Sequence, residues 1–273
     1  MSQTSTLDID ARGVAWLTLT RPEVHNAFDD ALIGELNRHL DRVRAAAERG
    51  EVRVMVLGSE GKSFSAGADL NWMKRMVDYS VDDNLADSRE LSRLMHGLDT
   101  LPCVTLCRVQ GAAFGGAVGL AACCDIVLAS QRAKFCLSEV KIGLSPAVIS
   151  PYVLRAIGSR QMRRYALSAE VMDATTAQAL DLVHRVVEPE ALDHAVESML
   201  ETLLATSPQA SRATKALLAE VARAPDEQAT RERTCLVISR LRVSDEGQEG
   251  LSSFLDKRRP AWAGTSNHSG SAS

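Results

Sequence analysis

The chain has 273 residues, of which 45% are hydrophobic and 24% are charged, and this is the size and composition of a globular protein with a substantial core. A formal net charge of −4 gives no electrostatic signature of nucleic-acid binding. The first residues lack the basic and apolar regions of a secretory signal, and no stretch approaches the roughly 18 apolar residues of a membrane span, so we expect a cytoplasmic protein that binds neither nucleic acid nor a membrane.

The first half of the chain predicts alternating strands and helices. Apolar, β-branched runs predict strands at residues 14–19, 52–57, 103–109, 125–129 and 134–137. Helical patterns cover residues 29–49, 70–73, 82–98 and 116–123, and Asp69 can cap the second of these helices. Strands that alternate with helices predict an α/β fold with crossover connections.

The second half of the chain is mostly helical. Helices are expected at residues 151–157, 160–168, 174–180, 190–205 and 208–240, with one further strand at 182–187. The last residues, 263–273, are rich in Ser and Gly and are expected to form a disordered tail.

The six cysteines give no pattern of a metal site or a disulfide framework. No Cys-x-x-Cys pair and no zinc-finger histidine spacing occurs among Cys103, Cys107, Cys123, Cys124, Cys136 and Cys235. All but Cys235 lie in apolar surroundings, where a thiol acts as a small hydrophobic group. We therefore expect no bound metal.

Two glycine-rich loops, about fifty residues apart, each end a predicted strand and lead into a predicted helix. They read Ser-Ala-Gly-Ala-Asp-Leu at 65–70 and Gly-Ala-Ala-Phe-Gly-Gly at 111–116. Small residues allow a ligand to approach the backbone, and the N–H groups of a helix start lack partners within the helix. Two such donors that meet at one oxygen form an oxyanion hole. Tight strand-to-helix turns without a ligand would favour the same residues.

A single acidic residue ends the strand that follows these loops. Glu139 lies within Phe-Cys-Leu-Ser-Glu-Val-Lys-Ile-Gly-Leu at 135–144. A carboxylate among apolar neighbours loses solvation, and its pKa then rises toward values that suit acid–base catalysis. The alternative is a surface salt bridge to Arg132 or Lys141.

Taken together, the two loops and the acidic strand resemble the crotonase (enoyl-CoA hydratase/isomerase) superfamily over about residues 10–260. The resemblance implies a spiral core of ββα turns at 1–200 and a helical C-terminal region at 201–262 that forms a homotrimer, often paired into a hexamer. It implies an acyl-CoA substrate, with coenzyme A as part of the substrate and no separate cofactor. The backbone amides of Ala68 and Gly116 would form the oxyanion hole, and Glu139 would move protons.

The same resemblance implies further substrate-binding positions. These are Ala27, Ala66, Asp69, Leu70, Gly115, Gly119 and Lys257. Lys257 would reach the CoA phosphates of a neighbouring site, although a Lys-Arg-Arg cluster at a helix end is often simply solvated. Asp69 fits a helix cap equally well.

Gly119 departs from the pattern of well-known hydratases, which carry a second glutamate at this position. Either Glu139 alone moves both protons with help from water or the substrate, or the enzyme shifts a double bond with one base. Glycine here removes a negative charge and is expected to leave space beside the acyl group. Both effects would suit a branched acyl chain that has its own carboxylate.

Residues 111–120 and 135–152 look like those of bacterial methylglutaconyl-CoA hydratases and the related isohexenylglutaconyl-CoA hydratases. The resemblance implies syn hydration of a branched, carboxylated enoyl-CoA in leucine or acyclic terpene degradation. Two alternatives are a double-bond isomerase and a non-catalytic protein that binds RNA or a partner through its basic C-terminal helix.

Overall fold

The computed structural model describes residues 4–224 and 226–263. The chain divides into two compact units, unit 1 at Met1–Ser198 and unit 2 at Met199–Ser273. The predicted tail lies outside the described residues, except for Ala263. Within the described ranges, every helix is too short or too polar to cross a membrane.

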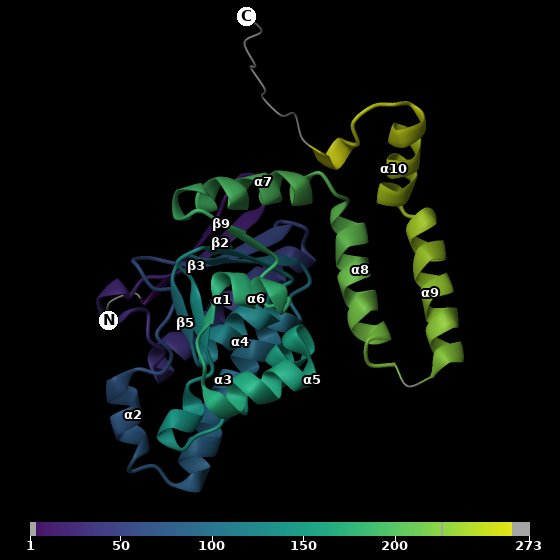
Figure 1. The fold of residues 1–273 in the computed structure, drawn as a ribbon. Helices are drawn as coiled ribbons and strands as arrows, with labels where there is room; N and C mark the ends of the chain where they lie inside the picture. The colour runs from purple at the N-terminus through teal and green to yellow at the C-terminus, as the bar shows by residue number, and fades with distance from the viewer. Residues whose placement is uncertain (1–3, 225, 264–273) are drawn as a thin grey trace, which may run out of the picture. The chain divides into compact units, whose positions relative to one another are not determined.

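A six-stranded sheet forms the centre of unit 1 (Figure 1). Its order is β1 (Ser5–Ile9), β2 (Val14–Leu19), β3 (Val54–Ser59), β4 (Val104–Val109), β6 (Ile126–Ser130) and β9 (Arg185–Val187). β1 and β2 are antiparallel, and all other neighbours are parallel. Every residue of β3 is buried, as expected for a parallel strand that is covered on both faces.

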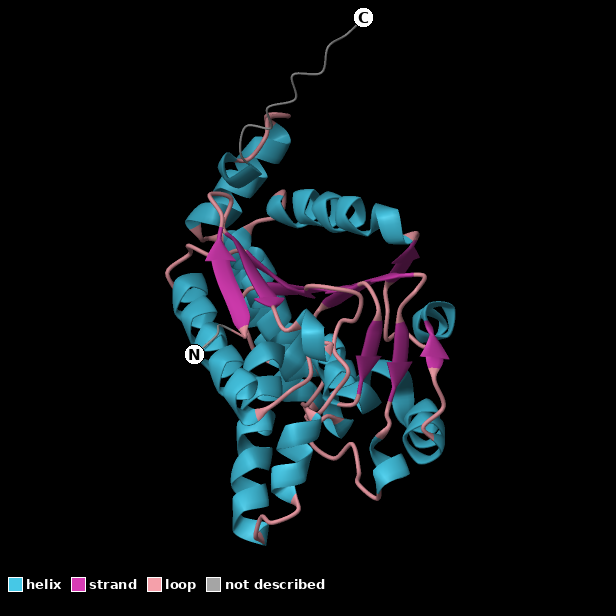
Figure 2. Cartoon of the chain, turned by 90° about the vertical axis from the view of Figure 1, so that its left-hand side faces the viewer, coloured by secondary structure: helices cyan, strands magenta, loops and turns pink. Residues whose placement is uncertain are grey.

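A second sheet of three short strands lies in a separate layer of unit 1. It consists of β5 (Ala112–Phe114), β7 (Lys134–Cys136) and β8 (Met172–Asp173), with β5 and β7 parallel. In Figure 2 its strands run steeply across those of the larger sheet. Because β5 and β7 are parallel, the residues that follow them emerge at the same edge of the sheet.

The helices of unit 1 cover these sheets. They are α1 (Asp30–Glu48), α2 (Leu70–Met76), α3 (Val81–Asp99), α4 (Gly116–Cys123), α5 (Ser150–Ser168) and α6 (Ala174–Ala179), and α7 (Leu192–Leu204) runs across the unit boundary. Asp29 caps α1 by accepting a hydrogen bond from the Leu32 amide, and an apolar stripe on this helix is buried. α4 is almost entirely apolar and packs against both α3 and α5.

In the described part of unit 2, the end of α7 is followed by α8 (Pro208–Val221), α9 (Glu227–Arg242), α10 (Asp245–Leu255) and a short 3₁₀ helix, η4 (Ala261–Ala263). The predicted single helix at 208–240 is therefore wrong. α8 ends at Val221, and the side chain of Asp226 accepts hydrogen bonds from two amides at the start of α9. A capping aspartate inside the predicted helix is the physical reason for the break.

The predicted α/β class is confirmed, and β2 and α4 have the predicted bounds. The break expected between helices at 151–157 and 160–168 is confirmed, because Gly158 within α5 has non-helical angles, with φ of +73° and ψ of 161°. The strand expected at 52–57 lies at Val54–Ser59 instead. β1, β5 and β8 were not predicted, because β5 and β8 are short and β1 has a mixed polar sequence.

Candidate active site

The two glycine-rich loops lie side by side at the edge where β5 and β7 end. The Phe114 amide donates to the Ser65 carbonyl at 3.0 Å, and the Ser65 amide donates to the Ala112 carbonyl at 2.9 Å. A Cβ atom on Gly67 would lie 3.0 Å from the Phe114 oxygen. Gly67 and Gly115 also have φ of +91° and +55°, so both positions favour glycine through conformation as well as space.

Two backbone amides of these loops are free to bind a ligand oxygen. Gly116 is the first residue of α4, and Ala68 is an exposed residue just before the cap of α2. Within the described residues, neither the Ala68 amide nor the Gly116 amide donates a hydrogen bond. The residues before them are neighbours, because a Cβ atom on Gly67 would lie 3.9 Å from the Cα of Gly115, so the two amides belong to adjacent stretches of backbone.

Phe28 connects the two loops, although it belongs to none of the motifs in the sequence. Its amide donates to the Gly67 carbonyl, and its carbonyl accepts from the Asp69 amide, both at 2.7 Å, so these bonds flank Ala68. Its ring lies 3.5 Å from the position of a Cβ atom on Gly116. One buried aromatic residue therefore contacts the surroundings of both free amides.

Arg21 holds the Phe28 segment in place. Its guanidinium donates to the carboxylates of Asp29 and Asp69, at 2.7 and 3.2 Å, and to the Ala27 carbonyl at 3.1 Å. The two aspartates cap α1 and α2. Asp69 lies 48 residues after Arg21 in the sequence, so this pairing is visible only in the structure.

Glu139 lies beside the second loop, at the start of a 3₁₀ turn, η2 (Glu139–Ile142), that follows β7. Its Oε1 atom is 3.3 Å from the position of a Cβ atom on Gly115. Its Oε2 atom is buried and has no hydrogen-bond partner in the described part of the chain. Burial raises the pKa of the Glu139 carboxyl above its ordinary value, and a hydrogen bond to its own backbone amide opposes this effect.

The alternative of a surface salt bridge for Glu139 finds no support among the described residues. Arg132 pairs with Glu190 at 3.4 Å, and neither Arg132 nor Lys141 pairs with Glu139. A half-buried carboxylate with an unpaired oxygen can accept a proton from a substrate and return it.

The space expected beside Gly119 does not exist, and this expectation is wrong. Gly119 is buried, and a Cβ atom there would lie 2.3 Å from Cγ2 and 2.7 Å from Cβ of Ile149, and 3.2 Å from the Met95 sulfur. Apolar side chains from α3 and from the start of α5 fill the volume. The other half of the expectation is unaffected, because glycine at position 119 carries no negative charge.

The other predicted binding residues form two groups. Ala27, Ala66, Asp69 and Leu70 belong to adjacent segments, because the Ala66 amide donates to the His25 carbonyl at 2.9 Å. Asp69 is buried as the cap of α2, whereas the Leu70 side chain is 73% exposed. Lys257 lies in unit 2, exposed, just after α10 with φ of +54°.

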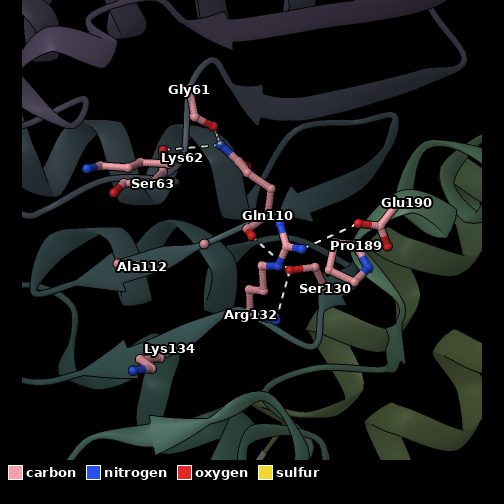
Figure 3. Close-up of a pocket in the computed structure, with 11 residues that line it drawn as sticks. Gly61, Lys62, Ser63, Gln110, Ala112, Ser130, Arg132, Lys134, Pro189 and Glu190 are labelled. Carbon is pink, nitrogen blue, oxygen red and sulfur yellow. Dashed lines mark hydrogen bonds and ion pairs between the residues drawn. The ribbon is translucent and has the colours of Figure 1, made fainter.

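A basic pocket of about 510 Å³ opens at the beginning of β5 and β7 and includes Gly111 and Ala112, the first residues of the second loop (Figure 3). It is lined by Gly61, Lys62, Ser63, Gln110, Gly111, Ala112, Ser130, Arg132, Lys134, Pro189 and Glu190. The side-chain amide of Gln110 donates hydrogen bonds to the loop at Ser59–Ser63, to the carbonyls of Ser59, Gly61 and Ser63 and to the Ser59 hydroxyl. Ala68, Gly116 and Glu139 do not line this pocket.

Known proteins match nearly the whole chain. The family model described as enoyl-CoA hydratase/isomerase matches residues 10–265. The chain is 31% identical to 2,3-dehydroadipyl-CoA hydratase of Escherichia coli, over 92% of this chain and 95% of the relative. It is 30% identical to trans-2-decenoyl-[acyl-carrier-protein] isomerase of Streptococcus mutans, with the same two coverages. A crystal structure of an enoyl-CoA hydratase from Shewanella pealeana superposes with a TM-score of 0.90 at 45% identity, over 95% of this chain and 96% of that chain.

Proposed function

The chain belongs to the enoyl-CoA hydratase/isomerase family, and we propose that it adds water across the 2,3 double bond of a branched, carboxylated enoyl-CoA. Substrates of this kind are 3-methylglutaconyl-CoA and isohexenylglutaconyl-CoA. The observation that carries the proposal is the unpaired Oε2 atom of Glu139 beside two free backbone amides.

The proposed reaction uses one carboxylate and two amides. The thioester oxygen accepts hydrogen bonds from Ala68 and Gly116, which draws electrons from the double bond. Glu139 takes a proton from water while the water oxygen bonds to the β-carbon, and the π electrons form an enolate on the thioester oxygen. Glu139 then gives that proton to the α-carbon. The net result is addition of one water, and both new bonds form on the face that Glu139 occupies.

The charge of the site supports a carboxylated substrate. Position 119 is a glycine enclosed by Ile149 and Met95, so the carboxylate that other hydratases place there is missing. An anionic acyl chain would therefore meet one carboxylate near the reacting carbons instead of two, which lowers like-charge repulsion. The E. coli relative named 2,3-dehydroadipyl-CoA hydratase also takes its name from a dicarboxylic acyl chain.

A double-bond isomerase is the second candidate, and two observations favour it. Position 119 supplies no second carboxylate beside Glu139, and one relative is named as an isomerase of an acyl-carrier-protein thioester. Mass spectrometry separates the two reactions, because hydration adds the mass of one water whereas isomerisation leaves the mass unchanged.

The test is a kinetic comparison of 3-methylglutaconyl-CoA, isohexenylglutaconyl-CoA and crotonyl-CoA. We expect a hydrated product from a branched substrate and a higher kcat/KM for it than for crotonyl-CoA. Equal or better turnover of crotonyl-CoA would contradict the carboxylate argument. The Glu139→Gln variant should lose about 10² to 10⁴-fold in rate, and an unchanged rate would contradict the proposed role of Glu139. Biological activity that survives in this variant without catalysis would favour a non-catalytic binding protein.

We further propose that the CoA part of the substrate lies over Ala27, Ala66, Asp69 and Leu70. Lys257 would bind the CoA phosphates within a homotrimer or hexamer. Lys257→Ala should then raise KM for acyl-CoA without lowering kcat. Light scattering of the purified protein tests the oligomeric state, and a monomer with full activity would contradict this arrangement.

A further inference from the structure

The buried contact between Gly119 and Ile149 leaves no room for any side chain at position 119. Gly119 lies one helical turn after Gly116 on α4, so both residues are on the same face of the helix. A Cβ atom on Gly119 would lie 2.3 and 2.7 Å from two carbon atoms of Ile149. Carbon atoms normally touch at roughly 3.5–4.0 Å, so these distances are far too short. The third neighbour, the Met95 sulfur at 3.2 Å, closes the remaining side.

Ile149 is held firmly in this position. It is the residue before α5, it is 2% exposed, and its carbonyl accepts hydrogen bonds from the Tyr152 and Val153 amides at 3.1 Å each. A β-branched side chain has few allowed χ1 angles, so Ile149 has little freedom to turn away from Gly119. α5 also packs against η2, the turn that carries Glu139.

We propose that Ile149 is a specificity-determining residue, because it fills the volume at position 119 and so keeps out a second carboxylate that would repel an acyl chain with its own negative charge. This inference rests on the proposed hydration of a carboxylated enoyl-CoA. No second carboxylate then joins Glu139 from position 119, and neutral enoyl thioesters gain nothing from the missing charge.

The first test measures whether Ile149 excludes side chains at position 119. Gly119→Ala alone should lower Tm by about 2–10 °C through overpacking. The same substitution in the Ile149→Gly background should lower Tm by much less, because the two nearest atoms are gone. Equal effects of Gly119→Ala in both backgrounds would overturn the exclusion.

The second test measures the effect of charge. Gly119→Glu and Gly119→Gln, each combined with Ile149→Gly, form a matched pair that differs in one negative charge. The readout is the ratio of kcat/KM for 3-methylglutaconyl-CoA to that for 3-methylcrotonyl-CoA, which has the same branch without the carboxylate. The Glu variant should lower this ratio at least about 10-fold relative to the Gln variant. Equal ratios would overturn the proposal.

Two further measurements test the role of Ile149 if the double variants do not fold or if the protein does not catalyse the proposed reaction. If the double variants do not fold, Ile149→Asp against Ile149→Asn asks the same question without a change at Gly119. If the wild-type protein hydrates neither substrate, the proposed function has failed. The charge preference is then read from the dissociation constants of 3-methylglutaryl-CoA and isovaleryl-CoA, which need no turnover. An affinity ratio that does not differ between the Asp and Asn variants would overturn the role of Ile149.

Discussion

Gly115→Ala is the substitution whose cost follows most directly from the structure. Gly115 has φ of +55° and ψ of −124°, a conformation that residues with a side chain rarely adopt. Forcing alanine into it costs about 1–3 kcal/mol of folding free energy. The new Cβ would also lie 3.3 Å from Oε1 of Glu139. Relief of either strain rotates the peptide between Gly115 and Gly116 and moves the Gly116 amide.

Loss of one oxyanion donor lowers kcat by about 10²–10³-fold, so we expect a decrease of this size for Gly115→Ala. The assay is steady-state kinetics of hydration, with thermal unfolding measured on the same samples. Gly50→Ala is the matched control, because Gly50 also has positive φ, +80°, but no atom lies within 4 Å of its Cβ position. The control should lose stability and keep kcat. A kcat within about 3-fold of wild type for folded Gly115→Ala would refute the role of this peptide.

Three other substitutions test the surroundings of the site. Phe28→Leu keeps the backbone bonds around Ala68 but loses the ring contact with Gly116, so kcat should fall about 10-fold with little change in KM, as measured by steady-state kinetics. Arg21→Gln should destabilise the protein by about 3–5 kcal/mol, because it leaves the partly buried carboxylates of Asp29 and Asp69 without their cation. Urea unfolding measures this change, and a decrease in unfolding free energy below about 1 kcal/mol would contradict it. Burial raises the pKa of Glu139, so protonation of this residue favours the folded state. As the pH rises from below the ordinary pKa of 4.5 through the raised pKa, the wild type should therefore lose stability relative to Glu139→Gln. A constant difference in stability across this pH range would contradict the burial effect.

Much of the fold could be predicted because its main elements have strong local signals. The apolar run of β2 and the small-residue helix α4 were predicted with the observed bounds. β5 and β8 could not be predicted, because strands of three and two residues depend on pairing with β7 and carry no periodicity of their own. The break between α8 and α9 depended on one capping residue, Asp226, inside a longer helical pattern.

The candidate site was predictable where a motif occupies one continuous segment. Both glycine-rich loops and Glu139 were predicted in this way, and the structure brings Gly67, Gly115 and Glu139 close together. The residues that surround them come from distant segments. Phe28 lies forty residues before Ala68, and Ile149 lies thirty residues after Gly119, so only tertiary contacts reveal their roles.

The most direct test of the account is a crystal structure of the Glu139→Gln variant with a bound branched enoyl-CoA. We predict that the thioester oxygen lies within about 2.7–3.1 Å of the amide nitrogens of both Ala68 and Gly116. The side chain at position 139 should face the α- and β-carbons of the acyl group. A thioester oxygen that contacts only one of these amides, or a residue 139 that points away from the acyl carbons, would contradict the proposed chemistry.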